Sequence, residues 1–350
     1  FDFTKKMSQQ PAIGILFGSQ YITVAFYNGK AIDIITTIDG SRSTPVFITK
    51  TEDEWMVGES SKEQHIYNMQ STTTNLARVL AVEAYANELF SYLVELIKSH
   101  TGINVNKQRA CVVVDQDNLR ELVVNALSKH FASVTSLSAP SAALVAYQYD
   151  LPRKEDLHIA TLDIGGHSAC LSVLKADTQG YIHHVATFSC DDDNVTGDAV
   201  DALVMGYLFK MFAKKAKCIK NINELSKKGQ LKLQYKSEEA KCVLSSTNKV
   251  QVDIAALFEG IDMSISLTRS RYEILLKPAI TAAETFIKGC LEQINVKIDH
   301  VLLMGGNLLI PKIRSSIESL FKKLLSNDVV IQQSKPLREV AAEGAALQGS

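Results

Sequence analysis

The sequence predicts an α/β protein built as two lobes, because one pattern of strand, glycine turn and strand occurs twice. The first copy covers residues 12–27 and turns at Gly18-Ser19, and the second covers residues 158–174 and turns at Gly165-Gly166. The copies lie about half a chain apart, and strands alternate with helices between them, which is typical of α/β lobes. We expect Gly165-Gly166 to take the positive φ of a two-residue hairpin.

The composition is that of an ordinary globular protein, and 350 residues are enough for two or three compact units. The formal net charge of -1 gives no reason to expect the whole surface to attract nucleic acid or a membrane. No apolar run in the sequence is long enough to span a bilayer. The six cysteines form no C-x-x-C pair, and as free thiols they favour a reducing, cytoplasmic location.

The first lobe should begin with a meander of strands over residues 12–48, in which Asn28-Gly29 and Asp39-Gly40 are hairpin signals. Residues 55–80 should be irregular and then helical. The hydrophobic pattern then predicts helices at 83–98, 118–130 and 140–147 and strands at 109–114 and 133–137.

The second lobe should start near residue 158 with further hairpins. Its later strands are expected at 250–253, 263–267 and 300–304, and its helices at 197–217, 224–244, 271–293, 311–325 and 338–348. Pro278 should interrupt the long helix, because proline removes a backbone hydrogen bond inside a helix.

Glycine turns of this kind can bind phosphate, because backbone N–H groups approach an anion closely where no Cβ intervenes. A third pair, Gly305-Gly306, follows the apolar run at 300–304 and opens a helix, whose N-terminus attracts anions. Asp163 stands at a strand end, where it could hold Mg²⁺ through water. The alternative for one such turn alone is an ordinary hairpin with a solvated aspartate.

Four more passages accompany the three turns, at residues 139–147, 258–262, 267–273 and 310–312. Together, and in this order, they resemble the nucleotide-binding domain of the DnaK-type heat-shock seventy-kilodalton chaperones. That domain has the two-lobed actin-like ATPase fold, related to ribonuclease H. The resemblance runs from about residue 11 to the end of the chain.

The resemblance implies lobe I at 11–150 and lobe II at 151–350, the latter with a subdomain at about 220–300 that carries the adenine-contact helix. The family has a small sheet-bearing subdomain between the helices that here end near Leu80 and begin at Glu83. Since Ala81-Val82 joins these helices directly, we expect that subdomain to be missing. The chain also stops where the family's peptide-binding domain would begin.

The resemblance implies ATP or ADP as cofactor, with Asp163 as the metal ligand. The nucleotide-binding positions that match the family are Gly18, Ser19, Gly165, Gly166, Ser168, Gly197, Glu238, Lys241, Ser245, Gly305 and Gly306. Glu238, Lys241 and Ser245 fall on one helix face, and the alternative for them is a solvated amphipathic helix.

The departures from the family concern its charged groups. Leu16, Ala77 and Ala139 occupy the positions of the family's first carboxylate, its catalytic lysine and a glutamate, so we expect no catalytic residue. His167 and Cys170 also replace a glycine and an aspartate, while Cys242 and Leu309 replace the arginines that sandwich adenine. Several such losses should leave hydrolysis negligible and ATP binding weak.

These departures are similar to those of the atypical, ribosome-associated branch of the family. We therefore expect a non-hydrolysing platform for a J-domain co-chaperone or the ribosome. The lysine pairs at 214–215, 227–228 and 322–323 are either solvated helix faces or a ribosome-facing patch. The alternatives are an active ATP-driven motor in which Arg78 replaces the lysine and, with less support, an actin-like structural protein.

Overall fold

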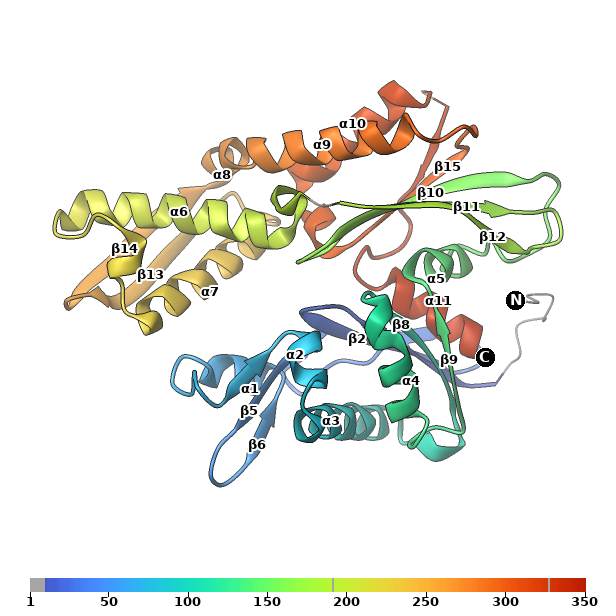
Figure 1. The fold of residues 1–350 in the computed structure, drawn as a ribbon, viewed down its shortest axis with the longest axis horizontal. Helices are drawn as coiled ribbons and strands as arrows, with labels where there is room; N and C mark the ends of the chain where they lie inside the picture. Colours follow the sequence, from blue (N-terminus) through green and yellow to red (C-terminus); the bar gives the residue numbers. More distant parts are fainter. Residues whose placement is uncertain (1–9, 191, 327) are drawn as a thin grey trace.

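A computed structural model describes residues 10–190, 192–326 and 328–350, and the first nine residues therefore lie outside it. Two sheets lie one above the other, with two helices between them (Figure 1). The predicted α/β fold with two sheets is confirmed. Within the described ranges, no helix combines the length and apolar character needed to cross a membrane.

The first sheet has the order β3-β2-β1-β8-β9, and its strands follow from buried apolar runs. Their bounds are β1 Ala12–Phe17, β2 Tyr21–Tyr27, β3 Ile32–Ile34, β8 Arg109–Val114 and β9 Ser133–Leu137, with the short β4 Thr44–Pro45 paired to β2. β1 runs antiparallel to β2 and parallel to β8, and β8 runs parallel to β9.

The second sheet repeats this arrangement with the order β12-β11-β10-β15-β16. Its strands are β10 Leu157–Ile164, β11 Ala169–Ala176, β12 Ile182–Ser189, β15 His300–Met304 and β16 Val330–Gln332. As β1 does in the first sheet, β10 runs antiparallel to the strand that follows it, β11, and parallel to its other neighbour, β15. The repeated order places the carboxyl ends of β1 and β10 at corresponding edges of their sheets.

Helices cover both outer faces and fill the space between the sheets (Figure 1). Below the first sheet lie α3 Glu83–Thr101 and α4 Arg120–Leu127, above the second lie α9 Lys277–Leu291 and α10 Pro311–Leu324, and between them lie α5 Ala139–Ala146 and α11 Val340–Gly349. One hydrophobic core joins α5 and α11 to strands of both sheets. This central layer therefore holds the lobes together.

α11 packs on β1 of the first sheet, although the expected division placed it in lobe II. The approach is close, because a Cβ added at Gly14 would lie 2.2 Å from Ala342 O, and one at Gly344 would lie 1.7 Å from Ala142 O. Small residues in both helices permit this spacing. The division at residue 150 stays a prediction for the rest of the chain.

Residues 55–74 differ from the expectation, because with residues 47–50 they form a three-stranded sheet and a short helix rather than irregular chain. The elements are β5 Phe47–Lys50, β6 Trp55–Val57, α1 Glu59–Gln64 and β7 Thr72–Thr74, followed by α2 Leu76–Leu80. Lobe I thus keeps a small sheet ahead of the direct Ala81-Val82 junction. Asp39-Gly40 forms a turn but no hairpin, since β3 and β4 both pair with β2.

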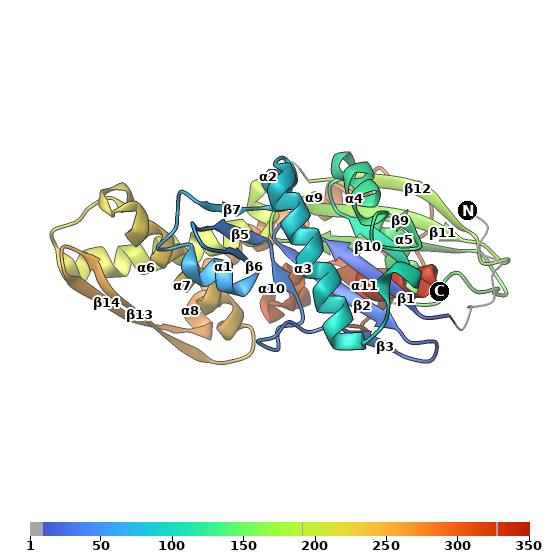
Figure 2. The same cartoon turned by 90° about the horizontal axis from the view of Figure 1, so that it is seen from below.

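The remaining helices and strands of lobe II form an arm that faces this small sheet (Figure 2). They are α6 Gly197–Ala216, α7 Lys227–Leu244, β13 Lys249–Phe258, β14 Ile261–Thr268 and α8 Arg269–Leu275. Short 3₁₀ turns lie elsewhere along the described chain, at Val105–Lys107, Asp117–Leu119, Asp193–Val195, Ile222–Glu224 and Gly306–Leu309. The break predicted near Pro278 lies between α8 and α9, at Leu276.

Replacing Gly344 by alanine should destabilise the protein, because the new methyl group would clash with the backbone of α5. Overpacking of this kind costs about 3 kcal/mol or more where backbone cannot move. The matched control is Gly206→Ala in the exposed interior of α6, where nothing lies within 4 Å of the added Cβ. It should stabilise the helix by about 0.5–1 kcal/mol. Equal urea midpoints for the two variants would contradict the close-packed central layer.

Candidate nucleotide site between the lobes

A cavity of about 230 Å³ lies between the lobes, at the carboxyl ends of β1 and β10. Its lining includes all the positions predicted to bind nucleotide or metal: Gly18, Ser19, Asp163, Gly165, Gly166, Ser168, Gly197, Glu238, Lys241, Ser245, Gly305 and Gly306. Leu16 also lines the cavity, whereas Ala77, Arg78 and Ala139 do not. The fold thus brings together residues from five separated parts of the sequence.

The turn at Gly165-Gly166 is a four-residue loop, in which the Gly165 N–H donates to Ser168 O at 2.9 Å. Neither glycine has positive φ, so that expectation is wrong. A Cβ at position 166 would lie 2.5 Å from Gln20 Oε1, so the Gln20 side chain would have to move away from its bond to Asp198. Gly305 does take a positive φ of 94°, and a Cβ there would lie 2.3 Å from Ile164 O.

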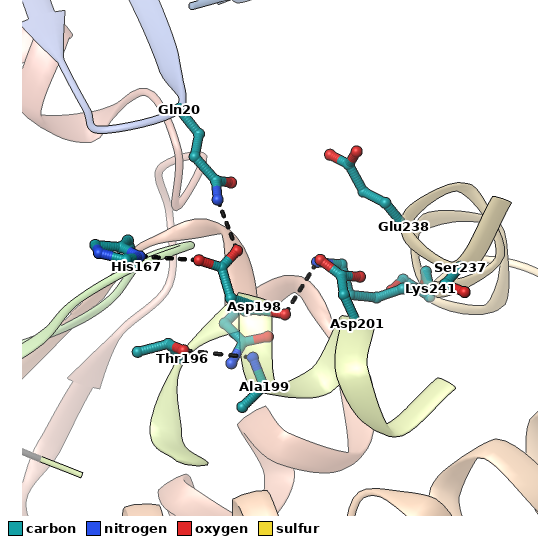
Figure 3. Close-up of polar contacts among 12 residues, drawn as sticks. Gln20, His167, Thr196, Asp198, Ala199, Asp201, Ser237, Glu238 and Lys241 are labelled. Carbon is teal, nitrogen blue, oxygen red and sulfur yellow. Dashed lines mark hydrogen bonds and ion pairs between the residues drawn. The ribbon is translucent and has the colours of Figure 1, made fainter. Parts of the chain in front are cut away.

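The N-terminus of α6 meets this loop directly. The Gly197 N–H donates to Gly165 O at 3.0 Å, and the Asp198 N–H donates to Gly166 O at 2.8 Å. The Thr196 side chain accepts from the Ala199 N–H, which caps the helix (Figure 3). Since carbonyls of the turn already satisfy these N–H groups, the helix offers few free donors to a phosphate.

A first side-chain contact crosses from lobe I to lobe II at the two turns. Gln20 Nε2 donates to Asp198 Oδ1 at 2.6 Å, while His167 Nδ1 lies 2.9 Å from Asp198 Oδ2 (Figure 3). Gln20 follows the first turn and packs over Gly166 of the second. The space between the two predicted phosphate turns is therefore bridged by protein atoms.

A second crossing contact joins β2 and α1 of lobe I to α7. The Tyr21 hydroxyl donates to Glu238 at 2.6 Å, and Lys62 Nζ donates to Glu238 at 3.0 Å and to Tyr21 Oη at 3.1 Å. Burial opposes ionisation of Glu238, but Lys62 and the two donated hydrogen bonds outweigh it and hold the pKa of Glu238 below its usual value. His65 and Tyr235 contact each other beside this pair.

Lys241 and Ser245, predicted to contact adenosine, also have protein partners. Lys241 Nζ donates to Asp201 at 2.7 Å and to Gly197 O at 3.4 Å, and the Ser245 hydroxyl donates to Lys241 O at 3.0 Å. Burial raises the pKa of Asp201 to about 6, although Lys241 acts in the opposite direction. A ligand that bound Lys241 or Ser245 would have to replace these hydrogen bonds. The two residues would therefore add little to the free energy of ligand binding.

Asp115 is a cleft residue that the sequence analysis missed. It follows β8, and its N–H donates to Phe17 O at 3.1 Å. Its side chain lines the cavity together with Asp163, close enough for the two charges to interact. The ends of parallel strands meet at one edge of a sheet, and a carboxylate directly after the predicted strand at 109–114 was the available signal.

Neither Asp115 nor Asp163 has a hydrogen-bond or ion-pair partner among the described residues. Protein atoms lie on most sides of both carboxyl groups, although the Asp115 side chain is also accessible to water from the cavity. This limited solvation raises the pKa of both groups, and the charge of Asp163 raises the pKa of Asp115 further. Two carboxylates that no described cationic side chain contacts form a donor set that fits Mg²⁺. This ion prefers one or two carboxylates together with water and phosphate oxygens.

Replacing Asp115 by asparagine should stabilise the protein at pH 8 and change it little at pH 4. A carboxyl group whose pKa is raised by folding stabilises the folded state below its unfolded pKa, and this contribution is lost as pH rises through the folded pKa. Thermal unfolding in EDTA measures the effect. Asp33→Asn, on an exposed position of β3, is the matched control. A shift in unfolding temperature of equal size at both pH values would count against the repulsion.

Removing both crossing contacts should let the lobes separate, because each joins lobe I to α6 or α7. We expect the double variant Gln20→Ala, Lys62→Ala to have a larger radius of gyration than the wild type in small-angle X-ray scattering without nucleotide. The control is Arg314→Ala, which removes a 2.7 Å ion pair to Glu318 within α10. Identical scattering of wild type and double variant would show that other contacts close the cleft.

Comparison with known proteins identifies the family. A family model described as Hsp70 protein matches residues 12–113 and 136–350. The chain is 24% identical to Heat shock 70 kDa protein of Emericella nidulans and to Heat shock 70 kDa protein 2 of Paracoccidioides lutzii. It is 25% identical to Heat shock cognate 70 kDa protein 3 of Dictyostelium discoideum. These alignments cover 97% of the chain but only 57–60% of each relative, so the chain spans less than two thirds of their length. Since the family model matches most of the chain, the chain belongs to the Hsp70 family, and its lobes have the actin-like ATPase fold of that family's nucleotide-binding domain.

Proposed function

We propose that this Hsp70-family domain binds nucleotide weakly, does not hydrolyse ATP at a significant rate, and serves as a docking platform for a J-domain co-chaperone or the ribosome. The observation that carries the proposal is the combination of a complete scaffold with a cleft that lacks the family's charged catalytic groups. Leu16 occupies the end of β1 in the cavity, and no lysine there is free of a carboxylate partner among the described residues.

The loss of catalysis is supported by the size of the effects involved. Phosphoryl transfer depends on positioned charges, and removing one preorganised stabiliser commonly costs about 10²–10³ in rate. Arg78, the candidate replacement for the lysine, is exposed on α2 and does not line the cavity. The active-motor alternative therefore has no cation at the position that it requires.

Weak binding is supported by the volume and the bonding of the cleft. The cavity of about 230 Å³ is smaller than the roughly 300–1,000 Å³ of sites that enclose a drug-sized ligand. A nucleotide must therefore widen the cleft and exchange existing contacts of Gln20 and Glu238. Mg²⁺, held by Asp163 and Asp115, would neutralise part of the phosphate charge when bound. These two residues would orient it, and Cys242 and Leu309 would offer adenine only apolar contact.

The platform role is supported by contacts that close the cleft through protein side chains alone. Because these contacts join Gln20 to Asp198 and Lys62 to Glu238, we expect the lobes to keep their arrangement without nucleotide. A partner would then meet the same surface with or without ATP. The lysine pairs at 214–215 and 322–323 are exposed and available to an acidic partner or ribosomal RNA. A cytoplasmic location fits a sequence whose six cysteines form no C-x-x-C pair.

Titration calorimetry with Mg-ATP and Mg-ADP, combined with phosphate release, tests the proposal. We expect measurable but weak binding of both nucleotides and no steady-state turnover above background. This chain keeps an aspartate, Asp163, at the position of the family's metal ligand. Asp163→Ala is therefore the informative variant, and Asp33→Asn is the control. Turnover at a rate typical of active relatives, abolished by Asp163→Ala but kept in Asp33→Asn, would refute the non-hydrolysing assignment.

A further inference from the structure

One cation in the cleft has no ion-pair partner among the described residues, and it lies at a position that the family resemblance did not single out. The charged side chains that line the cavity are Asp115, Asp163, Glu238, Lys241 and Arg338. Glu238 is bound by Tyr21 and Lys62, and Lys241 is bound by Asp201. The guanidinium of Arg338 makes no hydrogen bond or ion pair with any described residue.

The position of Arg338 is set by the residues that meet in the cleft. It lies in the turn before α11, and the Gly305 N–H donates to the neighbouring Leu337 O at 3.0 Å. Its Cζ lies 5.8 Å from the centre of the Tyr21 ring, in cation–π contact. A Cβ at Gly306 would lie 2.7 Å from Arg338 Nε, so the glycine leaves room for the guanidinium.

Arg338 therefore lies between the third glycine turn, in lobe II, and Tyr21, which follows the first glycine turn in lobe I. Its side chain is exposed to the cavity rather than to a neighbouring carboxylate. Glu339, next in the chain, is already paired with Arg42 at 2.6 Å. The cation is thus held near the turns with its donors open to a ligand.

We propose that Arg338 binds the phosphate groups of the nucleotide in this cleft. This inference rests on the proposed nucleotide binding. A guanidinium presents donors in a planar fork that matches two phosphate oxygens, and it stays charged at every physiological pH. A diphosphate beside Arg338 would neutralise the positive charge of the guanidinium. A divalent ion bound to that diphosphate would neutralise the negative charges of Asp163 and Asp115.

Calorimetric titration of three probes separates this role from the alternatives. The probes are ADP, inorganic pyrophosphate and adenosine, and the variants are Arg338→Gln and Arg338→Lys. Arg271→Gln is the matched control, because Arg271 is an exposed arginine outside the cavity that also makes a cation–π contact, to Tyr207. Arg338→Gln should weaken ADP and pyrophosphate about 10- to 100-fold, the usual effect of a hydrogen-bonded charge. Arg338→Lys should lose less, since it keeps the charge but not the fork.

Adenosine binding should be the same in wild type and all variants. Equal loss of ADP and adenosine in Arg338→Gln would overturn the inference, since the arginine would then stack on the base or support Tyr21. Unchanged ADP affinity in Arg338→Gln would overturn it while leaving nucleotide binding intact. A wild type that binds neither ADP nor pyrophosphate would overturn both this inference and the nucleotide part of the proposed function.

Discussion

The close packing of α11 against β1 and α5 is the constraint on which the arrangement of the two lobes depends. Gly14 and Gly344 let backbone meet backbone at distances that no larger residue permits. The resulting layer of alanine and other small apolar residues joins strands of both sheets in one core. Because the sheets are held at this spacing, the ends of β1 and β10 face each other, and the glycine turns between their strands can form the two sides of one cleft.

The cleft that results is shaped for a nucleotide but is largely satisfied by its own side chains. The Asp198 carboxylate is hydrogen-bonded to Gln20 and His167, and the Glu238 carboxylate is hydrogen-bonded to Tyr21 and Lys62. The N–H groups at the start of α6 bond to the turn beside them. A ligand in this cleft gains only the difference between its own bonds and those it replaces, which is small for each exchanged hydrogen bond.

Three charges in the cleft stay outside this internal network: the carboxylates Asp115 and Asp163 and the guanidinium of Arg338. They come from β8, β10 and the turn before α11, so they converge only in the folded protein. Their signs are arranged as a phosphate with a bound divalent cation would require. The same cleft thus combines lost catalytic charges with retained capacity for an anion.

The sequence by itself determined most of the elements and the predicted binding positions of the cleft, because both follow from local pattern and from motif order. Apolar runs predicted most strands of the two large sheets, and every predicted binding position came to line one cavity. It determined neither the φ of Gly165 and Gly166 nor the approach of Gln20 from the other lobe to Gly166. The partners of Glu238, the proximity of Asp115 to Asp163 and the open guanidinium of Arg338 were decided only by tertiary structure. Each joins residues far apart in the chain, and such contacts depend on the relative placement of the lobes, which no local pattern records.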